Sequence, residues 1–563
     1  MKQMLAVFLT LLLALGLFIG CETPQATPIP DGQTQAPTEA LTEALTEAPT
    51  EAPAQAQELA VPVPQGVTAA TDNNRVFYEI FVGSFSDSDG DGIGDLRGII
   101  NRMDYLNDGD ETSGRSLGIE GIWLTPIFSS GSYHKYDVTD YYTVDVNFGT
   151  LEDLKELAEL CHQRNVKLIL DLPINHTSRL NSWFVKFSQA HKDGNPEDPY
   201  YDFYCWYRKG EPQPGGRTFA PIGGTDDYYE CNFDTGMPEL NFDNEAVRQA
   251  VLDVAKFYLD LGVDGFRFDA AKYVYFGDNG TSVDFWTWYM DQLRAIKPEL
   301  YTVAEVWDGD GVTEMYYPAL NCFDFTVAQV NGLISNTAQK GDVNKYVSYV
   351  QSYVDKISPL REDAAMVPFI ANHDTDRAGG YLMTSNGTAQ MGANLLLLGP
   401  GSPFLYYGEE LGMRGSRGSA NTDANRRLAM AWGDGDTVKD PEGATYPADA
   451  RVDFPAADQL ASPDSLYNYY KQVILLRKAN PEIASGSFTG LQLSDTKVGG
   501  FISEKDGSRV LVLHNTTGSP YTLELTGDLS GFSTLSGSVG LGSAELNGST
   551  LTLDAQTSVV LRK

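Results

Sequence analysis

The chain has 563 residues, enough to bury a large core and to form two or three domains. Its 76 Asp and Glu residues outnumber its 40 Lys and Arg residues, which gives a formal net charge of -36. Because binding to nucleic-acid phosphates needs clustered cations, this acidity argues against nucleic acid as a partner. A neutral or cationic ligand and carboxylate-rich metal sites are compatible with it.

The amino terminus has the features of a targeting segment. An apolar run from Met4 to Ile19 follows Lys2 and has the length of the hydrophobic region of a signal peptide. Gly20 and Cys21 then resemble the cleavage site of bacterial lipoproteins. This pattern predicts a signal peptide at residues 1–20, a lipid on Cys21 and a protein anchored to the membrane outside the cell. An ordinary secretory signal with an incidental Cys is the alternative.

Residues 21–70 are rich in Pro, Thr, Glu, Ala and Gln, and no Lys or Arg lies between Cys21 and Asn74. Such a segment buries too little apolar surface to fold. We therefore predict a disordered tether that holds the folded part away from the membrane. After the signal peptide, no stretch is apolar and long enough to span a bilayer.

From about residue 75 onward, short β-branched runs alternate with amphipathic helical patterns. This alternation predicts a parallel sheet with crossover helices, and eight strands favour a closed (β/α)8 barrel, or TIM barrel, over an open sheet. The strands are expected at Val76–Phe85, Ile119–Ile127, Val166–Ile174, Val263–Asp269, Tyr301–Val306, Phe323–Ala328, Met366–Ala371 and Pro403–Tyr407. The clearest helices are expected at Leu151–Arg164, Glu245–Leu261, Val283–Ile296 and Ser465–Ala479.

The alternation is interrupted once, after the third strand. A stretch of about seventy residues rich in Tyr, Asp, Pro and Gly predicts a small inserted domain at residues 176–243. The barrel then occupies residues 71–175 and 244–484. From residue 485 to residue 563, short alternating strands separated by Gly, Ser and Thr predict an antiparallel β-sandwich. Its strands are expected at Arg509–His514, Tyr521–Leu525, Leu551–Leu553 and Ser558–Leu561.

Four cysteines follow Cys21, and none of them forms a CxxC pair, which argues against a zinc site. Cys161 lies in a helical pattern and is expected to be a buried thiol. Cys205 and Cys231 fall in one irregular region, and the sequence leaves open whether they form a disulfide.

An acidic loop follows the first strand, with Asp87, Asp89, Asp91 and Asp95 among Ser and Gly residues. Hard oxygen ligands on a tight loop are typical of a calcium site. The spacing begins like an EF-hand, but the twelfth position is Gly98, where that motif has a bidentate Glu. Asp95 must therefore close the site. A solvated acidic loop without a metal is the alternative.

Polar side chains lie where several predicted strands end. The segments are Asp171–His176 at the end of the third strand, Gly265–Lys272 at the end of the fourth, Glu305–Trp307 at the end of the fifth and Asn372–Asp374 at the end of the seventh. In barrels of this kind, chemistry takes place at the carboxyl ends of the strands. We therefore expect Asp269, Glu305 and Asp374 to converge on one pocket.

Two facing carboxyl groups can cleave a glycosidic bond, because one protonates the leaving oxygen while the other attacks the anomeric carbon. Strand alternation places Arg267 on the same side as Asp269, and we expect its guanidinium to keep this carboxylate ionised. The neighbouring Trp307 and other carboxylates would raise the pKa of Glu305, as a general acid requires. His176 and His373 are expected to be neutral donors to sugar hydroxyls.

These segments resemble the conserved regions of the alpha-amylase family, glycoside hydrolase family 13, over roughly residues 75–563. The similar segments are, in order of region, Asp171–His176, Gly265–Lys272, Glu305–Trp307, Phe369–Asp374 and Met237–Asn241. The resemblance implies that Asp269 is the nucleophile, Glu305 the general acid/base and Asp374 the stabiliser of the transition state.

The resemblance also implies a set of sugar-binding residues, namely Tyr136, Asp137, His176, Arg267, Lys272, His373 and Arg427. Tyr136 would stack beneath a sugar ring. Asp137 would pair with Arg427, and in relatives such a pair walls off sugars beyond the cleaved bond and favours short substrates. A plain structural salt bridge is the alternative.

For the acidic loop, the resemblance is to the calcium loop of oligo-1,6-glucosidase-like members. It implies a calcium ion held by the side chains of Asp87, Asp89, Asp91 and Asp95 and by the carbonyl of Ile93. Many amylases hold another calcium with help from a His after the second region. Tyr273 stands at that place here, which leaves a second calcium open.

We therefore expect a monomeric, calcium-binding, retaining glycoside hydrolase that cleaves the α-1,4 bonds of starch or maltooligosaccharides. An exo-acting oligo-glucosidase or a transglycosylase with the same three carboxylates is the first alternative. A glucan-binding surface protein that has lost catalysis is the second, and it is disfavoured because such proteins usually lack one of the three carboxylates.

Overall fold

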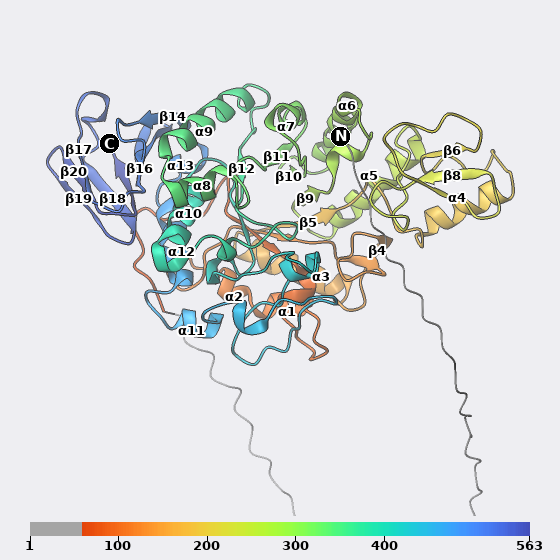
Figure 1. The fold of residues 1–563 in the computed structure, drawn as a ribbon, viewed down its shortest axis with the longest axis horizontal. Coiled ribbons are helices and arrows are strands. Elements are labelled where there is room, and N and C mark those ends of the chain that lie inside the picture. The colour runs from red at the N-terminus through yellow and green to blue at the C-terminus, as the bar shows by residue number, and fades with distance from the viewer. Residues whose placement is uncertain (1–58) are drawn as a thin grey trace, which may run out of the picture. The chain divides into compact units, whose positions relative to one another are not determined.

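In the computed structural model, which describes residues 59–563, eight parallel strands form a barrel (Figure 1). The strands are β1 (Phe77–Ile80), β2 (Gly121–Leu124), β5 (Lys167–Leu172), β9 (Gly265–Phe268), β10 (Tyr301–Ala304), β11 (Asn321–Asp324), β12 (Val367–Pro368) and β13 (Phe404–Tyr406). They pair in the order β12-β11-β10-β9-β5-β2-β1-β13, and a parallel bridge between Phe369 and Phe404 joins the two ends. The predicted (β/α)8 barrel is confirmed.

Alternation along the strands decides which side chains fill the barrel. The interior holds a buried cluster made largely of aromatic rings and β-branched residues: Phe77, Trp123, Ile169, Tyr301, Val303, Phe323, Ala328, Val367, Phe369 and Phe404. In β9, Phe266 and Phe268 pack outward in the layer between strands and helices. Arg267, which alternates with them, lies inside, with its guanidinium 5.2 Å from the Trp123 ring.

Helices cover the outside of the barrel, and the sequence explains where several of them begin. The barrel helices are α1 (Leu96–Asn101), α2 (Met103–Leu106), α3 (Leu151–Gln163), α5 (Glu245–Asp260), α6 (Asn279–Ile296), α7 (Asp310–Tyr316), α8 (Leu333–Lys340), α9 (Val343–Ile357), α10 (Thr388–Leu397), α11 (Ala456–Leu460), α12 (Leu466–Lys478) and α13 (Glu482–Ser485). Thr150 and Asp153 form a capping box at the start of α3. α6 begins four residues before the predicted Val283, because the Asp278 side chain caps it.

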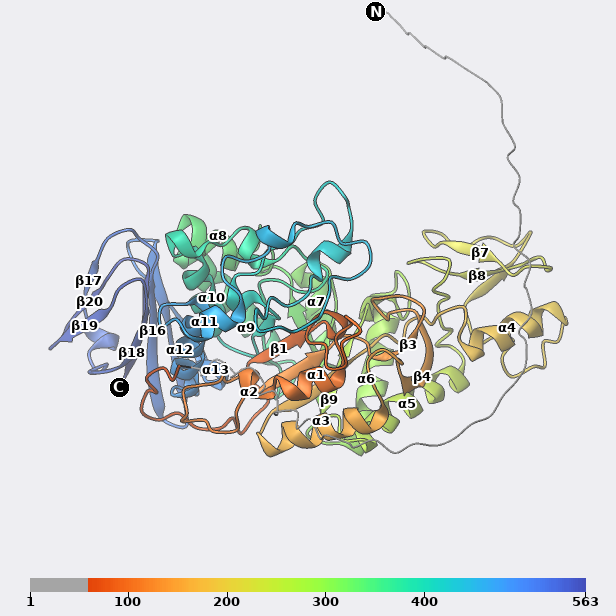
Figure 2. The ribbon, with the colours of Figure 1, turned by 90° about the horizontal axis from the view of Figure 1, so that it is seen from below.

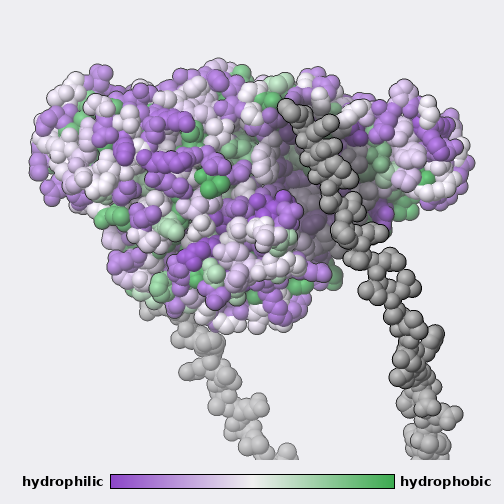
Figure 3. All heavy atoms as spheres, viewed as in Figure 1, coloured by the Kyte–Doolittle hydropathy of each residue, from purple (hydrophilic) through white to green (hydrophobic). Residues whose placement is uncertain are grey.

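The segment that follows β5 carries a small sheet of its own, at the right in Figures 1 and 2. Helix α4 (Ser182–Lys192) precedes strands β6 (Trp206–Arg208), β7 (Phe219–Pro221) and β8 (Asp227–Glu230), which pair in the order β6-β8-β7. A separate hairpin of β3 (Phe128–Ser130) and β4 (Val138–Val144) follows β2. In Figure 3 the surface is hollowed where the inserted segment meets the barrel.

The carboxyl-terminal part consists of two antiparallel sheets, as predicted. β14 (Ser487–Gln492), β15 (Val498–Lys505), β16 (Ser508–Asn515), β21 (Thr557–Arg562) and β18 (Thr534–Gly540) form the larger sheet. β17 (Tyr521–Glu524), β20 (Thr550–Leu553) and β19 (Ala544–Asn547) form the smaller one. Helix α9 packs against β14 and β15, which attaches these sheets to the barrel.

The predicted tether extends too far. Its last residues, 59–70, pack on the folded part: the Val61 N–H donates to the Gly114 carbonyl at 2.9 Å, and Val61 is only 8% exposed. The reason is local, because this stretch is apolar and its prolines already restrict the backbone, which lowers the entropy that ordering costs. The predicted signal peptide, Cys21 and the tether up to residue 58 lie outside the described residues. Within residues 59–563, no helix is long and apolar enough to cross a membrane.

Cys205 and Cys231 are both free thiols, so the disulfide that the sequence left open is not formed. The strand register explains why. Trp206 lies opposite Tyr229 in the β6–β8 pair, so Cys205 lies opposite Glu230 and Cys231 is one residue further along. Because side chains alternate, the two sulfur atoms point to opposite faces of the sheet.

Candidate active site

The guanidinium of Arg267 is the centre of the site at the carboxyl end of the barrel. Its Nη1 donates to both oxygens of Asp171, at 2.8 and 2.9 Å, and to Oδ1 of Asp269 at 2.7 Å. Its Nη2 lies 3.0 Å from Oε2 of Glu305. Arg267 is fully buried, so these three carboxylates supply the negative charge that a desolvated cation needs. One side chain therefore holds the predicted nucleophile and the predicted acid together.

Burial, more than the guanidinium, decides how Asp269 and Glu305 titrate. Burial raises the pKa of Asp269 to about 6, although Arg267 lowers it. Burial likewise raises the pKa of Glu305 to about 7, again against Arg267. The predicted rise for Glu305 is confirmed. Asp269 is still mostly ionised at neutral pH, as expected, and Arg267 contributes to this by lowering its pKa, although the desolvation of the buried carboxylate has the larger effect.

The turn that follows Asp269 links this residue to Glu305. The Glu305 Oε2 accepts a hydrogen bond from the Ala270 N–H at 2.9 Å, and the Glu305 carbonyl accepts one from Ala271. Ala270 adopts a left-handed backbone conformation with φ 45°, which costs a residue with a side chain roughly 1–2 kcal/mol. Strain of this kind next to Asp269 fits a site whose geometry is imposed by its surroundings.

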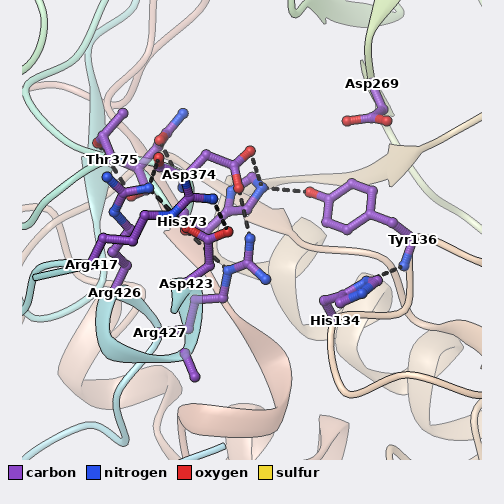
Figure 4. Close-up of polar contacts among 12 residues, drawn as sticks. His134, Tyr136, Asp269, His373, Asp374, Thr375, Arg417, Asp423, Arg426 and Arg427 are labelled. Atoms are coloured by element: carbon purple, nitrogen blue, oxygen red, sulfur yellow. Dashed lines mark hydrogen bonds and ion pairs between the residues drawn. The ribbon is translucent and has the colours of Figure 1, made fainter. Parts of the chain in front are cut away.

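Asp374 lies between two cationic groups (Figure 4). Its Oδ1 is 2.7 Å from Nη2 of Arg427, and its Oδ2 is 3.1 Å from Nε2 of His373. The Arg426 side chain adds a hydrogen bond at 2.7 Å to the Asp374 carbonyl. The negative charge of Asp374 in turn raises the pKa of Asp269. The three predicted catalytic carboxylates therefore lie in one electrostatically connected cluster, as expected from the sequence.

His373 is charged, which corrects the expectation of a neutral donor. Burial alone would lower its pKa, but Asp374 and Glu79 outweigh burial and raise the pKa to about 10. The Nδ1 of His373 lies 2.5 Å from Oε1 of Glu79 on β1. Burial would raise the pKa of Asp374, yet His373 holds it well below the usual range. His176 behaves as predicted, because burial lowers its pKa to about 4 and keeps it neutral.

Tyr136 joins the two halves of the site. Its hydroxyl donates to Oδ2 of Asp171 at 2.9 Å and lies 2.7 Å from Nε2 of His373, and its ring stacks on the His373 ring. In Figure 4 the Tyr136 side chain reaches from its own loop to His373. The Nε2 of His176 is 3.2 Å from the Tyr136 carbonyl, so His176 holds the loop that carries Tyr136.

The predicted ion pair between Asp137 and Arg427 is wrong. Asp137 accepts hydrogen bonds from the hydroxyls of Ser130 and Ser132. Arg427 donates to Asp374 and, at 3.0 Å, to the hydroxyl of Tyr133. The hydroxyls of Ser130 and Ser132 satisfy the Asp137 carboxylate locally, which leaves the Arg427 guanidinium to Asp374.

Two carboxylates of the site were given no role in the sequence-based prediction, and the exposure of Trp307 was not predicted. Glu79 and Asp171 are buried carboxylates that balance the charges of His373 and Arg267, and both lie inside strands rather than at their ends. Trp307 is 43% exposed, although its ring stacks on Phe325 at 4.8 Å. The Nζ of Lys272 donates to the Trp307 carbonyl at 2.7 Å. The sequence carried one signal for Glu79 and Asp171, because each carboxylate lies among apolar residues of a strand.

The acidic loop after β1 brings together part of the predicted calcium ligands. Carboxylate oxygens of Asp87, Asp89 and Asp95 lie within 4.8 Å of one another, whereas Asp91 is not part of this group. The Asp91 carboxylate instead accepts a hydrogen bond at 2.7 Å from the Ile93 N–H. Gly90 and Gly92 have φ values of 87° and 97°, a conformation that lets the loop turn tightly around the three carboxylates.

A separate cavity of about 810 Å³ opens at the other end of the barrel. Arg75, Lys167 and Tyr301, which lie before or at the start of barrel strands, are part of its lining. None of the predicted site residues lines it. Because barrel enzymes carry their chemistry at the carboxyl ends of the strands, the grouping of charged residues locates the site better than this cavity does.

The fold and the site define a class of protein. A closed (β/α)8 barrel with two carboxyl groups bridged at the carboxyl ends of neighbouring strands has the equipment for chemistry at a glycosidic bond.

Comparison with known proteins agrees with this class. Residues 79–486 match the family model described as alpha amylase, catalytic domain, and residues 498–560 match the one described as alpha-amylase SusG C-terminal domain. The chain belongs to the alpha-amylase family, glycoside hydrolase family 13, whose members are glycoside hydrolases and transferases.

Two curated relatives and one solved structure illustrate the similarity. The chain is 35% identical to Alpha-amylase 3 of Dictyoglomus thermophilum over 450 residues, which are 78% of this chain and 84% of that protein. It is 29% identical to the Oligo-1,6-glucosidase of Bacillus cereus over 537 residues, which cover 81% of this chain and 92% of that one. The structure of Eubacterium rectale Amy13B superposes with a TM-score of 0.80 at 33% identity, covering 88% of this chain and 97% of that chain.

The charge on His373 can be tested by replacing its partner on β1. We expect Glu79→Gln to lower the pKa of His373 by about one pH unit, because one of the two carboxylates that raise it is neutralised. NMR titration of histidine-labelled protein measures this pKa directly. His514, whose low pKa comes from burial alone, serves as an internal reference. An unchanged His373 titration would show that Glu79 does not hold the charge.

Proposed function

We propose that the protein hydrolyses the α-1,4-glucosidic bonds of starch or maltooligosaccharides with retention of configuration. One observation carries the proposal: a single buried guanidinium bonds to both Asp269 and Glu305. Retaining enzymes need their two carboxyl groups about 5–5.5 Å apart, whereas inverting enzymes leave room for a water between them. Two carboxylates on one guanidinium favour the shorter separation.

The proposed reaction has two steps. In the first, an oxygen of Asp269 forms a bond to the anomeric carbon, the bond to the leaving oxygen breaks, and Glu305 gives its proton to that oxygen. In the second, a water attacks the same carbon, Glu305 takes the water proton, and Asp269 leaves as a carboxylate. The pKa values of about 6 and about 7 fit these roles, since near neutral pH Asp269 is mostly ionised while Glu305 keeps a proton in a large share of molecules.

Asp374 is proposed to stabilise the positive charge that develops on the sugar ring in both steps. His373 and Arg427 hold its carboxylate in the ionised form, as its lowered pKa indicates. Negative charge that is fixed before the reaction costs no reorganisation in the transition state. Tyr136, with its ring stacked on His373, would lie beneath the sugar, and His176, Arg267 and Lys272 would contribute to its binding.

Endo-action is the favoured mode. Asp137 and Arg427 do not form the pair that would close the pocket beyond the cleaved bond, which supports binding of chains that continue on that side. An exo-acting oligo-glucosidase or a transglycosylase is the second candidate. The similarity to an oligo-1,6-glucosidase over most of the chain supports this second candidate. A glucan-binding protein without catalysis is disfavoured, because all three carboxylates are present in one cluster.

We also propose that calcium binds the loop after β1, on the convergence of Asp87, Asp89 and Asp95. Three carboxylates at this distance repel one another, and a divalent cation with oxygen ligands would offset that repulsion. Calcium would supply no catalytic group in this proposal and would stabilise the loop. The Ile93 carbonyl and Asp91, which were predicted as further ligands, belong to the same loop.

The location of the protein is proposed from the sequence. The signal-peptide pattern at residues 1–20 and Cys21 support export and a lipid anchor on the outside of the cell, with the tether between the membrane and the barrel. A monomer is proposed as the working assembly.

The proposed activity predicts a defined outcome with soluble starch. The protein is expected to release a mixture of maltooligosaccharides, and Asp269→Asn is expected to lower kcat by at least about a thousandfold at an unchanged melting temperature. Chromatographic sizing of the products and a thermal melt measure both. Asp260→Asn, a control in an exposed ion pair on α5, should retain full turnover.

Two results would contradict this proposal. Release of glucose alone from the first time point would favour the exo-acting candidate over endo-action. Full turnover by the Asp269→Asn variant would show that another group is the nucleophile.

Calcium binding predicts a loss of stability on chelation. Removal of calcium with EDTA is expected to lower the melting temperature by several degrees, because a ligand that binds only the folded state stabilises it. Asp89→Asn should melt at the chelated temperature with or without added calcium. A melting temperature that calcium and EDTA leave unchanged would indicate a solvated acidic loop.

A further inference from the structure

The two faces of the small β6–β8–β7 sheet differ in what covers them. On one face, Tyr229 and Ala220 are buried and Trp206 packs against His191 of α4 with ring centroids 4.6 Å apart. Strand register places Tyr207, Phe219 and Tyr228 together on the opposite face. These three rings form what we call the aromatic face.

The aromatic face is ordered and partly open to solvent. Tyr207 and Tyr228 stack with centroids 5.3 Å apart and an angle of 24° between the rings. Phe219 meets Tyr207 edge-on at 4.7 Å. None of the three rings is buried, and Pro221, opposite Tyr228, is exposed. These partly exposed rings belong to none of the hydrophobic clusters within residues 59–563.

A series of contacts that begins at Arg217, beside the aromatic face, leads toward the barrel. Arg217 precedes β7 and pairs at 2.9 Å with Glu230, the residue that lies opposite Phe219 in the sheet. Its guanidinium stands 5.8 Å from the Phe276 ring and donates to the Phe276 carbonyl at 3.1 Å. Phe276 belongs to the loop after β9, so the inserted sheet is joined to the loop that carries Asp269.

The same series reaches the pocket itself. The Phe276 ring contacts Tyr273 at 5.5 Å, Tyr273 contacts Phe233 at 4.9 Å, and Phe233 contacts His176 at 5.3 Å. Phe233 is 46% exposed, a large fraction for a Phe that touches a site residue. Lys272, next to Tyr273, bonds to the carbonyl of Trp307, two residues beyond Glu305. The aromatic series therefore leaves the pocket on the side of the proposed acid.

We propose that the aromatic face binds the leaving-group part of a long α-glucan whose cleaved bond lies in the pocket. This inference rests on the proposed function. The apolar faces of glucose units stack on aromatic rings, and a neutral polymer is not repelled by a protein with a net charge of -36. Contact at a second point raises the apparent affinity for a long chain without changing the affinity for a short one. The face thus selects polymer over oligosaccharide.

The test compares a double variant, Tyr207→Ala/Tyr228→Ala, with a version that keeps the rings, Tyr207→Phe/Tyr228→Phe. Each is made alone and combined with Asp269→Asn, which allows starch binding to be measured without turnover. Affinity electrophoresis in gels containing soluble starch reports binding, and initial rates on starch and on maltotriose report catalysis. The alanine variant is expected to bind starch roughly tenfold more weakly and to raise KM for starch by a similar factor. Its kcat/KM for maltotriose should equal that of the parent.

The phenylalanine variant should bind starch like the parent, since stacking needs the rings and not the hydroxyls. Tyr142→Ala, which removes a 39% exposed ring on β4 next to Phe257, is the control for loss of an aromatic residue elsewhere. Starch affinity of the alanine variant equal to that of the parent would overturn the inference, as would an equal loss in Tyr142→Ala. Failure of the parent to cleave any α-glucan would overturn the proposed function instead, and starch retention by the Asp269→Asn protein would still report on the aromatic face.

Discussion

A buried guanidinium on β9 is the interaction on which the site depends. Arg267 is surrounded by the carboxylates of Asp171, Asp269 and Glu305, and it has no access to solvent. Removing the guanidinium would leave three buried carboxylates without their cation, and breaking a buried pair in this way costs roughly 3–5 kcal/mol. The same bonds that satisfy the cation also set the distance between the two carboxyl groups proposed to react. The same three contacts are therefore needed both for the stability of the folded protein and for the proposed reaction.

The barrel makes this arrangement available because neighbouring strands end side by side. Arg267 on β9 reaches Asp171 on β5 and Glu305 just after β10, and these strands are adjacent in the sheet. On the opposite side of the pocket, His373 and Arg427 hold Asp374 ionised. Burial raises the pKa of Asp269 to about 6 and that of Glu305 to about 7, so near neutral pH Asp269 is mostly ionised while Glu305 is close to half-protonated. Three carboxyl groups thereby acquire different pKa values, and the difference comes mainly from their partners and their burial.

The strand–helix alternation and the residues at the strand ends were enough to predict the barrel and the cluster of Asp269, Glu305 and Asp374. Both depend on local periodicity and on the rule that strands of a barrel end together. Contacts between distant loops were not predictable in this way. The Asp137 carboxylate accepts hydrogen bonds from two nearby hydroxyls, and Arg427 pairs with Asp374 instead. The carboxylate of Glu79 on β1 helps to raise the pKa of His373 and so favours its charged form. The ordered segment at residues 59–70 was missed because its Pro-rich composition resembles a tether, whereas its few apolar residues find partners only in the folded protein.

The stereochemistry of the first product tests the central claim most directly. If the guanidinium holds Asp269 and Glu305 at the short separation, attack by Asp269 and then by water inverts the anomeric carbon twice, and the new reducing end appears in the α form. Proton NMR during the first minutes of maltopentaose hydrolysis, before mutarotation, distinguishes the two anomers. We predict the α anomer, and initial formation of the β anomer would contradict the account.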